Sequence, residues 1–417
     1  MRKIKIEGRY PLTGTIRISG AKNSSVALVP AALLADDNVI LDNIPDISDI
    51  EALGEILEFL GAEVTRKQSV MEIHPATVKN NPIPEEISSK LRASYYFMGA
   101  LLAKFKKATV CFPGGCGIGA RPIDIHLKGF EALGATITVD DNKYTIEAQE
   151  LKGANIYLDI ASVGATINIM LAAVKATGTT VIENVSLEPE IVNVATLLNK
   201  MGANISGAGT GRIVITGVEQ LHGCFAEVIP DRIEAGTYMA LAALCGENLR
   251  IENIIPEHLE SFISKLQEIG VNIKIGTDYA IITKKEKYKP TEIITALYPG
   301  FPTDLQQPFT ILLTQSTGTS TVTETIWENR FMHIPYLVEM GARITVKDHS
   351  VAIIEPSTFE GKDIEATDLR AGAAMIIAGL IAKGTTTISN IEHILRGYSN
   401  IIEKLTNVGA HISLIDE

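Results

Sequence analysis

The fold is decided by a pattern that first appears in the stretch Ile50-Glu51-Ala52-Leu53-Gly54-Glu55-Ile56-Leu57-Glu58-Phe59-Leu60-Gly61-Ala62-Glu63-Val64. Its apolar residues recur at steps of three and four, which predicts a helix that ends at the glycine. The motif Gly-Ala-x-Ile/Val recurs at Gly61, Gly134, Gly202, Gly270 (followed by Val271 in place of alanine), Gly341 and Gly409. Six copies, spaced by 73, 68, 68, 71 and 68 residues, indicate six repeats of about 70 residues.

Each repeat opens with a second helix, which is rich in small side chains. These opening helices are expected at residues 26–34, 95–103, 166–174, 236–244, 308–313 and 372–381. A β-rich segment follows each of them, at residues 39–41, 109–111, 180–182, 249–251, 320–322 and 386–388. The resulting order of helix, strand, helix, strand, strand predicts an α/β protein. Small side chains on the opening helices favour close helix packing inside a core.

The chain of 417 residues is too long for one ordinary core. Six repeats fit two domains of three repeats each, with the boundary between residues 217 and 230. Residues 1–19 precede the first full repeat and need a sheet to join. Residues 223–229 are the matching strand before the fourth repeat.

Charge and cysteine usage restrict the function. The 37 basic and 49 acidic residues give a net charge of −12, which argues against a nucleic-acid surface. The cysteines Cys111, Cys116, Cys224 and Cys245 form no C-x-x-C pair and no zinc-like spacing, which favours a reducing cytoplasm. The N-terminus lacks the apolar run of a signal peptide, and the longest apolar run, residues 371–382, is too short to span a bilayer. We expect a cytoplasmic protein with no membrane, nucleic-acid, metal or cofactor partner.

Polar residues cluster where the repeats begin. The clusters are Gly20-Ala21-Lys22-Asn23, Lys90-Leu91-Arg92, Ser162-Val163-Gly164, Pro230-Asp231-Arg232, Phe301-Pro302-Thr303-Asp304 and Thr367-Asp368-Leu369-Arg370. Each precedes a helix whose free N–H groups and dipole favour an anion. Helix capping is the alternative role for Asp, Ser and Asn, and we favour it for Asp231. Capping does not explain Lys22, Arg92 or Arg370, so these starts predict a phosphate-binding surface.

A glycine-rich stretch carries one thiol and one guanidinium, Pro113-Gly114-Gly115-Cys116-Gly117-Ile118-Gly119-Ala120-Arg121-Pro122. Its four glycines allow backbone conformations that other residues avoid. One interpretation is a flexible surface loop with an incidental cysteine. The other is a lid that carries a reactive group and closes over an anionic substrate.

Other motifs are interpreted as structural. The glycine-rich residues 207–211 resemble a phosphate loop but lead into a strand, so we expect a hairpin turn there. The histidines His126, His333 and His393 have no metal-ligand spacing, and we expect them to serve local packing or hydrogen bonding.

Several separate motifs together resemble one family, the enolpyruvyl transferases, from Ile18 to the C-terminus. They are Ser19-Gly20-Ala21-Lys22-Asn23, Leu91-Arg92-Ala93-Ser94, the stretch Pro113 to Pro122, Ser162-Val163-Gly164-Ala165-Thr166, Phe301-Pro302-Thr303-Asp304, Glu328-Asn329-Arg330-Phe331-Met332-His333, Thr367-Asp368-Leu369-Arg370 and Arg396-Gly397-Tyr398. The resemblance implies a two-domain inside-out α/β barrel with three β-α-β-α-β-β units per domain and helices in the middle. It implies an N-terminal domain of residues 20–228, a C-terminal domain of residues 1–19 plus 229–417, and an active site in the cleft between them.

The resemblance also implies a reaction. The enolpyruvyl group of phosphoenolpyruvate moves to the 3′-hydroxyl of UDP-N-acetylglucosamine, phosphate is released, and this is the first committed step of peptidoglycan synthesis. Cys116 matches the family's general acid and Asp304 its base. The residues that match phosphoenolpyruvate contacts are Lys22, Asn23, Arg92, Arg121, Arg370 and Arg396. The residues that match nucleotide-sugar contacts are Asn23, Arg92, Arg121, Pro122, Ile123, Asp124, Ile125, Ser162, Val163, Gly164, Asp304 and Ile326. Arg330 and Asp368 are expected to support the site.

Two other functions fit part of these features. The shikimate-branch synthase of this family shares the fold but lacks the loop that contains the cysteine. Cys116 and residues 121–125 therefore argue against this function. A repeat-built clamp around DNA is a non-enzymatic alternative. The acidic charge and the cations at the helix starts argue against a clamp.

Overall fold

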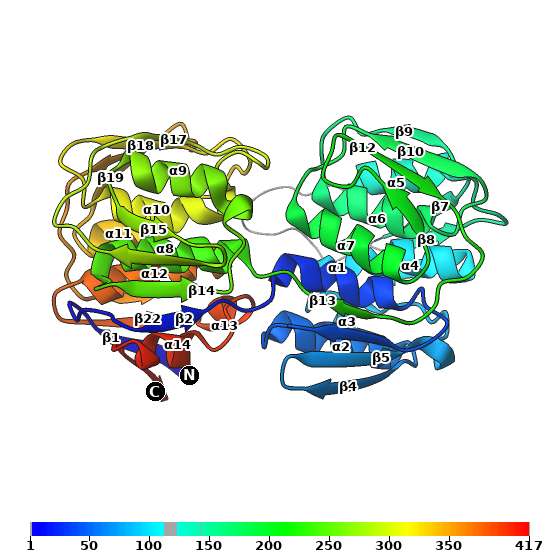
Figure 1. The fold of residues 1–417 in the computed structure, drawn as a ribbon, viewed down its shortest axis with the longest axis horizontal. Helices are drawn as coiled ribbons and strands as arrows, with labels where there is room; N and C mark the ends of the chain where they lie inside the picture. Colours follow the sequence, from blue (N-terminus) through cyan, green and yellow to red (C-terminus); the bar gives the residue numbers. More distant parts are fainter. Residues whose placement is uncertain (1, 112–122, 142, 417) are drawn as a thin grey trace. The chain divides into compact units, whose positions relative to one another are not determined.

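The computed structural model describes residues 2–111, 123–141 and 143–416. These residues form two compact units (Figure 1). The C-terminal unit contains residues 2–19 and 230–416, and the N-terminal unit contains the described residues between 20 and 229. Each unit has its own apolar core and three sheets.

The third repeat shows the plan on which the other repeats are built. An edge strand runs parallel to the strand that follows the opening helix, and a hairpin after the second helix completes the sheet antiparallel to it. We call the strand after the opening helix the crossover strand. In chain order the elements are β9 (Asn155–Tyr157), α6 (Val163–Ala173), β10 (Thr179–Glu183), α7 (Pro189–Lys200), β11 (Asn204–Ser206) and β12 (Arg212–Thr216). Residues 207–211 form the expected hairpin turn.

The remaining elements follow the same order. Those of the N-terminal unit are α1 (Lys22–Ala32), β3 (Val39–Asp42), α2 (Ser48–Phe59), β4 (Glu63–Lys67), β5 (Val70–His74), α3 (Glu85–Ser88), α4 (Tyr96–Phe105), β6 (Lys107–Cys111), α5 (Asp124–Ala132), β7 (Thr136–Asp140), β8 (Lys143–Glu147) and β13 (Phe225–Glu227). Those of the C-terminal unit are β1 (Arg2–Glu7), β2 (Thr15–Arg17), α8 (Arg232–Cys245), β14 (Leu249–Glu252), α9 (Glu260–Glu268), β15 (Asn272–Ile275), β16 (Tyr279–Thr283), β17 (Glu292–Ile294), α10 (Gln306–Leu313), β18 (Ser320–Thr323), α11 (Ile334–Glu339), β19 (Arg343–Lys347), β20 (Val351–Glu355), β21 (Asp363–Glu365), α12 (Leu369–Ile381), β22 (Thr385–Ser389), α13 (Glu392–Leu395), α14 (Ile401–Asn407) and β23 (His411–Asp416).

The six motif glycines end six helices. All six have positive φ, between 89° at Gly270 and 106° at Gly341, which suits glycine because it has no Cβ. In each case the next residue donates its N–H to the carbonyl five positions back, as Ala62 does to Leu57 at 3.0 Å and Ala203 to Leu198 at 2.9 Å. This is the Schellman closure of a helix, and it confirms the helix ends that the repeated motif predicts.

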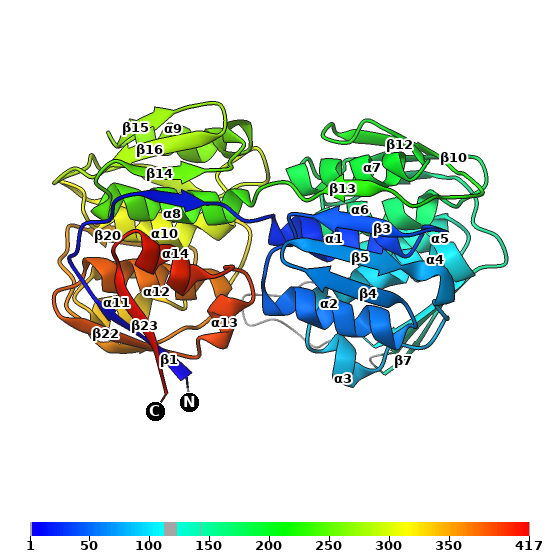
Figure 2. The same ribbon diagram turned by 60° about the horizontal axis from the view of Figure 1, so that its bottom comes forward.

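Two edge strands are exchanged where the chain passes from one unit to the other. β2 precedes α1 in the chain, yet it pairs in parallel with β14. β13 precedes α8, yet it pairs in parallel with β3, and Figure 2 shows β13 in green beside β3 in blue. The N-terminal segment therefore joins a sheet of the C-terminal unit through β2, and residues 223–229 supply the matching strand in the N-terminal unit.

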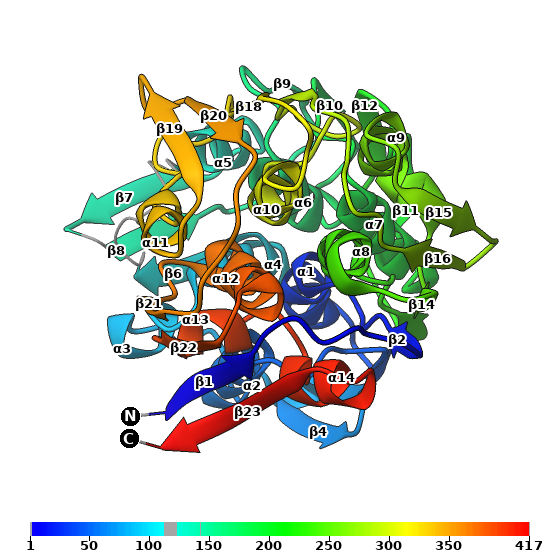
Figure 3. The ribbon, with the colours of Figure 1, turned by 90° about the vertical axis from the view of Figure 1, so that its left-hand side faces the viewer.

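The first strand completes the last sheet. The order there is β21-β22-β1-β23, so β1 occupies the place that the last hairpin strand takes in the other four-stranded sheets. β1 pairs antiparallel with both β22 and β23 (Figure 3). Both ends of the described chain are thereby held in one sheet.

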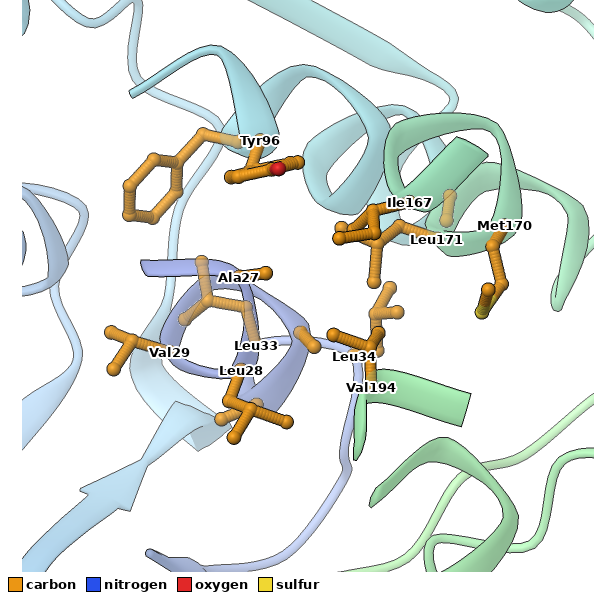
Figure 4. Packing of buried hydrophobic residues seen from close by; sticks show 14 of the residues in the cluster. Ala27, Leu28, Val29, Leu33, Leu34, Tyr96, Ile167, Met170, Leu171 and Val194 are labelled. Atoms are coloured by element: carbon orange, nitrogen blue, oxygen red, sulfur yellow. The ribbon is translucent and has the colours of Figure 1, made fainter. Parts of the chain in front are cut away.

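The opening helices lie inside each unit and the sheets lie outside. In the C-terminal unit α8, α10 and α12 are surrounded by strands (Figure 3). In the N-terminal unit α1, α4 and α6 meet in the core shown in Figure 4, where Leu28, Tyr96 and Ile167 are buried. Small residues let the helices approach closely: a Cβ on Gly99 of α4 would lie 2.3 Å from the carbonyl oxygen of Asn168 on α6. This confirms the close helix packing expected from sequence.

Candidate active site

Lys22 is the first residue of α1 and pairs with a carboxylate from the next helix. Its Nζ lies 2.8 Å from Oδ2 of Asp49, which belongs to the first turn of α2. The two side chains are only 13% and 3% exposed. Removing one partner of such a buried pair leaves an uncompensated charge. Asp49 therefore fixes where the Lys22 ammonium is presented, although the sequence motifs do not include it.

Asn23 is the next residue of α1 and faces a second buried carboxylate. Its Nδ2 lies 3.5 Å from Oε1 of Glu190, in the first turn of α7. Glu190 is 4% exposed and is separated from Asn23 by 167 positions in the chain. The start of α1 is thus lined by carboxylates that orient its polar side chains.

The start of α6 contains the Ser162-Val163-Gly164 motif. Ser162 caps the helix, since its Oγ accepts a hydrogen bond from the N–H of Ala165 at 3.2 Å. Gly164 lies against His126 and Tyr95: an added Cβ would be 3.0 Å from His126 Cε1 and from Tyr95 Oη. Only a very small residue therefore fits at position 164.

His126 belongs to a buried hydrogen-bond network. Its Nδ1 lies 3.1 Å from the Asn168 amide nitrogen, which also donates to the carbonyl of Tyr95 at 2.9 Å. Asn168 Oδ1 accepts from the N–H of Gly99 at 2.8 Å, so the amide is oriented by its partners. Burial lowers the pKa of His126 to about 3, so the ring is neutral and Nδ1 is its acceptor. The expectation of a hydrogen-bonding histidine is confirmed here.

The other predicted residues of this helix group lie at the start of α5. Asp124 and Ile125 occupy its first turn, and Ile123 is the buried residue just before it. Asp124 is exposed, while Ile125 is half-buried.

In the C-terminal unit, Asp304 forms ion pairs with two arginines. Its Oδ1 pairs with Nη2 of Arg330, and its Oδ2 lies 3.3 Å from Nε of Arg370. Both guanidinium groups are buried, at 3% and 4% exposed, whereas the carboxylate is 27% exposed. Opposite charges at this distance favour the ionised carboxylate. The structure thus brings together three residues that the sequence assigns to the site: Asp304, Arg330 and Arg370.

Two glutamines of α10 hold Arg330. Gln306 Nε2 donates to the carbonyl of Arg330 at 3.1 Å. Gln307, with its amide oxygen turned toward the guanidinium, accepts from Arg330 Nε at 2.8 Å. Both glutamines are fully buried. Because they directly follow the turn that contains Asp304, one short segment positions both members of the ion pair.

Arg370 lies in the first turn of α12 beside its cap. The Asp368 carboxylate accepts from the N–H groups of Arg370 and Ala371, at 2.8 and 3.0 Å. The guanidinium lies 5.4 Å from the ring centre of Tyr398. Burial lowers the pKa of Arg370, but Tyr398, Asp304 and Asp231 raise it by more, so the group stays charged.

Arg396 and Asp231 also belong to this unit. Arg396 is half-buried and follows α13, two residues before Tyr398. Asp231 accepts from the N–H groups of Ile233 and Glu234, at 2.8 and 3.0 Å, which confirms the predicted cap of α8.

Several predicted residues cannot be placed. Cys116, Arg121 and Pro122 lie outside the described residues. Arg92 begins a 3₁₀ turn, Arg92–Tyr95, and its side chain is not described.

Ile326 is placed by the structure: it is half-buried and follows β18. In the described part of the chain, no group of three or more His, Cys, Asp and Glu side chains is placed to hold a metal ion.

Each unit by itself holds cations at helix starts that suit the binding of an anion: Lys22 in the N-terminal unit, and Arg370 beside Asp304 in the C-terminal unit. The family described as EPSP synthase (3-phosphoshikimate 1-carboxyvinyltransferase) matches residues 6–405 of the chain. The chain therefore belongs to this family of enolpyruvyl transferases.

Full-length relatives are more specific in name. The chain is 55% identical over 411 residues to UDP-N-acetylglucosamine 1-carboxyvinyltransferase 2 of Listeria innocua, covering 99% of this chain and 97% of the relative. It is 54% identical over 419 residues to UDP-N-acetylglucosamine 1-carboxyvinyltransferase of Streptococcus pneumoniae, covering 100% of both chains.

Solved structures show the same fold. The enolpyruvyl transferase NikO from Streptomyces tendae matches with a TM-score of 0.90 at 28% identity, covering 99% of this chain and 98% of NikO. EPSP synthase from Acinetobacter baumannii matches with a TM-score of 0.76 at 19% identity over 100% of both chains, which bears on the fold alone. The expected enolpyruvyl transferase fold is confirmed. Among the helices of the described residues, none is long and apolar enough to cross a membrane.

Proposed function

We propose that this protein transfers the enolpyruvyl group of phosphoenolpyruvate to the 3′-hydroxyl of UDP-N-acetylglucosamine and releases phosphate. The observation that carries the proposal is the 54–55% identity, over essentially the whole chain, to relatives named for this carboxyvinyl transfer. Both substrates are small anions, and the arginines and lysine at the helix starts are suited to bind them. Such a reaction belongs to cell-wall synthesis, and we place it in the cytoplasm.

Asp304 is the proposed base. During addition, its carboxylate takes the proton of the sugar hydroxyl as the hydroxyl oxygen bonds to carbon 2 of phosphoenolpyruvate. A second proton reaches carbon 3, which becomes a methyl group. Arg330 and Arg370 each pair with one oxygen of the carboxylate. The two buried guanidinium groups therefore set the orientation of the partly exposed Asp304 side chain.

Cys116 is the proposed acid that delivers the proton to carbon 3. In the elimination step the bond between carbon 2 and the phosphate oxygen breaks, phosphate leaves, and carbon 3 returns one proton. Lys22, Arg121 and Arg396 are the proposed phosphoenolpyruvate contacts, with Arg92, Arg370 and Asn23 completing the set. Positioned acids and bases contribute about 10² to 10⁴ in rate.

The nucleotide sugar is assigned to residues at helix starts and turns and to one residue that follows a strand. Its proposed contacts are Asn23, Arg92, the segment 121–125, the segment 162–164, Asp304 and Ile326. The Ser162 cap and the tight fit at Gly164 support a fixed backbone at the start of α6.

Phosphate release with two acceptors tests the function. The purified protein is incubated with phosphoenolpyruvate and either UDP-N-acetylglucosamine or 3-phosphoshikimate, and inorganic phosphate is measured. We expect phosphate release when UDP-N-acetylglucosamine is the acceptor and none when 3-phosphoshikimate is. Asp304→Asn should release no phosphate with either acceptor. Release with 3-phosphoshikimate alone would assign the chain the activity for which its family is named.

A further inference from the structure

The repeats share an asparagine whose role is structural. In four repeats the residue after the crossover strand is an asparagine with positive φ: Asn43 (60°), Asn184 (57°), Asn253 (60°) and Asn390 (56°). Asparagine tolerates this left-handed conformation better than most residues do.

The asparagine amide ties the crossover strand to its parallel neighbour. Asn43, Asn184 and Asn253 donate from Nδ2 to the carbonyls of Val228, Leu158 and Ile18, at 2.9, 2.7 and 2.7 Å. Each acceptor is the residue that follows the parallel edge strand.

The fifth repeat has Glu324 at the same position. The positions are equivalent because the same backbone hydrogen bond recurs in these repeats. The residue after the edge strand donates its N–H to the carbonyl of the last residue of the crossover strand. The pairs are Val228 to Asp42 (2.9 Å), Leu158 to Glu183 (3.1 Å), Ile18 to Glu252 (2.9 Å), Thr295 to Thr323 (2.9 Å) and Ala366 to Ser389 (3.0 Å). In the described residues, Glu324 does not share the positive φ of the asparagines. The fifth repeat, which also contains Asp304, thus departs from the asparagine pattern of four other repeats.

A neighbouring threonine takes over the structural hydrogen bond. Thr325 Oγ1 donates to the carbonyl of Thr295 at 2.6 Å, the carbonyl that an asparagine would otherwise bind. Thr325 N–H also donates to Thr295 Oγ1 at 2.9 Å. The backbone carbonyl of Thr295 is therefore satisfied without the Glu324 side chain.

The Glu324 carboxylate instead connects three segments. Its Oε1 accepts from Thr295 Oγ1 at 3.0 Å and from the N–H groups of Ile326 and Trp327 at 2.8 and 3.2 Å. Its Oε2 accepts from Thr303 Oγ1 at 2.8 Å. Glu324 is 4% exposed, so these donors stabilise a carboxylate that lies away from water.

These partners lie beside the proposed chemistry. Thr303 directly precedes Asp304 in the turn before α10. Ile326 is the proposed nucleotide-sugar contact, and Ile326 and Trp327 line a surface pocket of about 370 Å³ together with residues 324, 325, 328 and 348–350. One buried carboxylate thus joins the turn that carries the base to the backbone that borders this pocket.

We propose that Glu324 is a positioning residue that couples the nucleotide-sugar contact at Ile326 to the placement of the Asp304 carboxylate. Occupation of the pocket edge and alignment of the base then depend on each other through the Thr303 hydroxyl. This inference rests on the proposed function, because Ile326 enters it as a contact of the nucleotide sugar. Local rules of a fold are most often broken at functional sites, which agrees with the departure at position 324.

Glu324→Asn is the decisive variant, because it restores the residue that four other repeats carry and should fold. Asparagine is too short to keep the Thr303 bond. We expect kcat to fall and the KM for UDP-N-acetylglucosamine to rise, lowering kcat/KM about tenfold or more, the effect of losing hydrogen bonds to a charged acceptor. The KM for phosphoenolpyruvate should stay unchanged. Glu324→Gln keeps an acceptor for the N–H groups and should lie between the wild type and Glu324→Asn.

The matched control is Asn253→Gly, which removes the structural asparagine of the fourth repeat and keeps its left-handed backbone. We expect it to lower stability without changing kcat or either KM. Thr303→Val replaces the hydroxyl with a methyl group and should lower kcat. The combined variant with Glu324→Asn should lose little more, since both changes break the same hydrogen bond.

Trp327 separates this inference from the proposed function. It is the chain's only tryptophan, so its fluorescence reports the backbone that Glu324 holds, without any substrate. We expect Glu324→Asn to shift the emission of the unliganded protein and Asn253→Gly to leave it unchanged. If the wild type releases phosphate only with another acceptor, the proposed function is wrong. The kinetics of the variants are then compared with the wild type on that acceptor. Wild-type kinetics or wild-type Trp327 emission in Glu324→Asn would overturn the positioning role.

Discussion

The ammonium of Lys22 lies 2.8 Å from the carboxylate of Asp49, and both side chains are almost completely buried. The cation that begins α1 is therefore not held by the helix dipole, which would repel it at this end. It is held by the first turn of α2. An anionic substrate at Lys22 meets a cation whose position is set by a partner within the same unit.

Lys22→Met should separate the structural from the functional role of this pair. We expect it to abolish turnover and to lower the free energy of unfolding by about 3 kcal/mol, because the buried Asp49 carboxylate loses its cation. Chemical denaturation and phosphate release measure the two effects.

The combined variant Lys22→Met with Asp49→Asn is the control for that measurement. Removing both charges should recover most of the lost stability and none of the activity. If stability does not recover, the ion pair is not what holds this part of the unit.

The sequence patterns predicted the helix ends and caps well because the hydrogen bonds that form them join residues a few positions apart in the chain. The Gly-Ala motif marks six helix ends since each glycine must adopt positive φ and the following N–H must reach back to the helix. Caps such as Asp231 are likewise decided within three residues.

The partners of the site residues could not be predicted in the same way. Asn23 meets Glu190 across 167 positions, and no spacing in the sequence encodes that contact. Gln307 and Asp49 are ordinary polar residues until the chain folds. Glu324 did carry a signal, because aligning the repeats shows asparagine in four of them where the fifth repeat has glutamate.

Gly99→Ala tests the close packing of the opening helices. An added Cβ would lie 2.3 Å from the carbonyl oxygen of Asn168 and 2.4 Å from its side-chain oxygen, so α4 and α6 would have to separate. We expect a loss of about 3 kcal/mol in the free energy of unfolding, as for other overpacked cores. Gly211→Ala is the matched control, since nothing lies within 4 Å of its added Cβ. Equal stability of the two variants would contradict the packing described here.

The protein should lose stability in mild acid because two buried histidines stay neutral. Burial lowers the pKa of His126 to about 3 and that of His333 to about 4, from 6.5. As the pH falls through 6.5 the unfolded chain binds protons that the folded protein does not, so the free energy of unfolding falls from pH 6.5 down to about 4 for His333 and about 3 for His126. Above pH 6.5 these two groups contribute no pH dependence.

His126→Phe tests the assignment to a particular ring. Protonating Nδ1 would break its bond with the Asn168 amide, so removal of the ring should reduce the slope of unfolding free energy against pH, near pH 5, by about one proton. Denaturant titrations at several pH values give this slope. His349→Asn replaces an exposed histidine and should leave the slope unchanged. An unaltered slope in His126→Phe would show that the acid response originates elsewhere.

The thiols should differ sharply in reactivity, because the thiolate is the reacting form. Burial raises the pKa of Cys245 to about 12, and burial also raises the pKa of Cys224, although Lys200 lowers it in part. Burial thus disfavours reaction at Cys224 and Cys245. An epoxide phosphonate such as fosfomycin should add once, at the proposed acid Cys116, and Cys111→Ala should be labelled like the wild type. Cys116→Ala should take up no reagent, bind UDP-N-acetylglucosamine nearly normally and lose turnover. Peptide mapping by mass spectrometry locates the adduct. Full activity of Cys116→Ala would remove the thiol from the reaction and leave the glycine-rich stretch without the acid assigned to it.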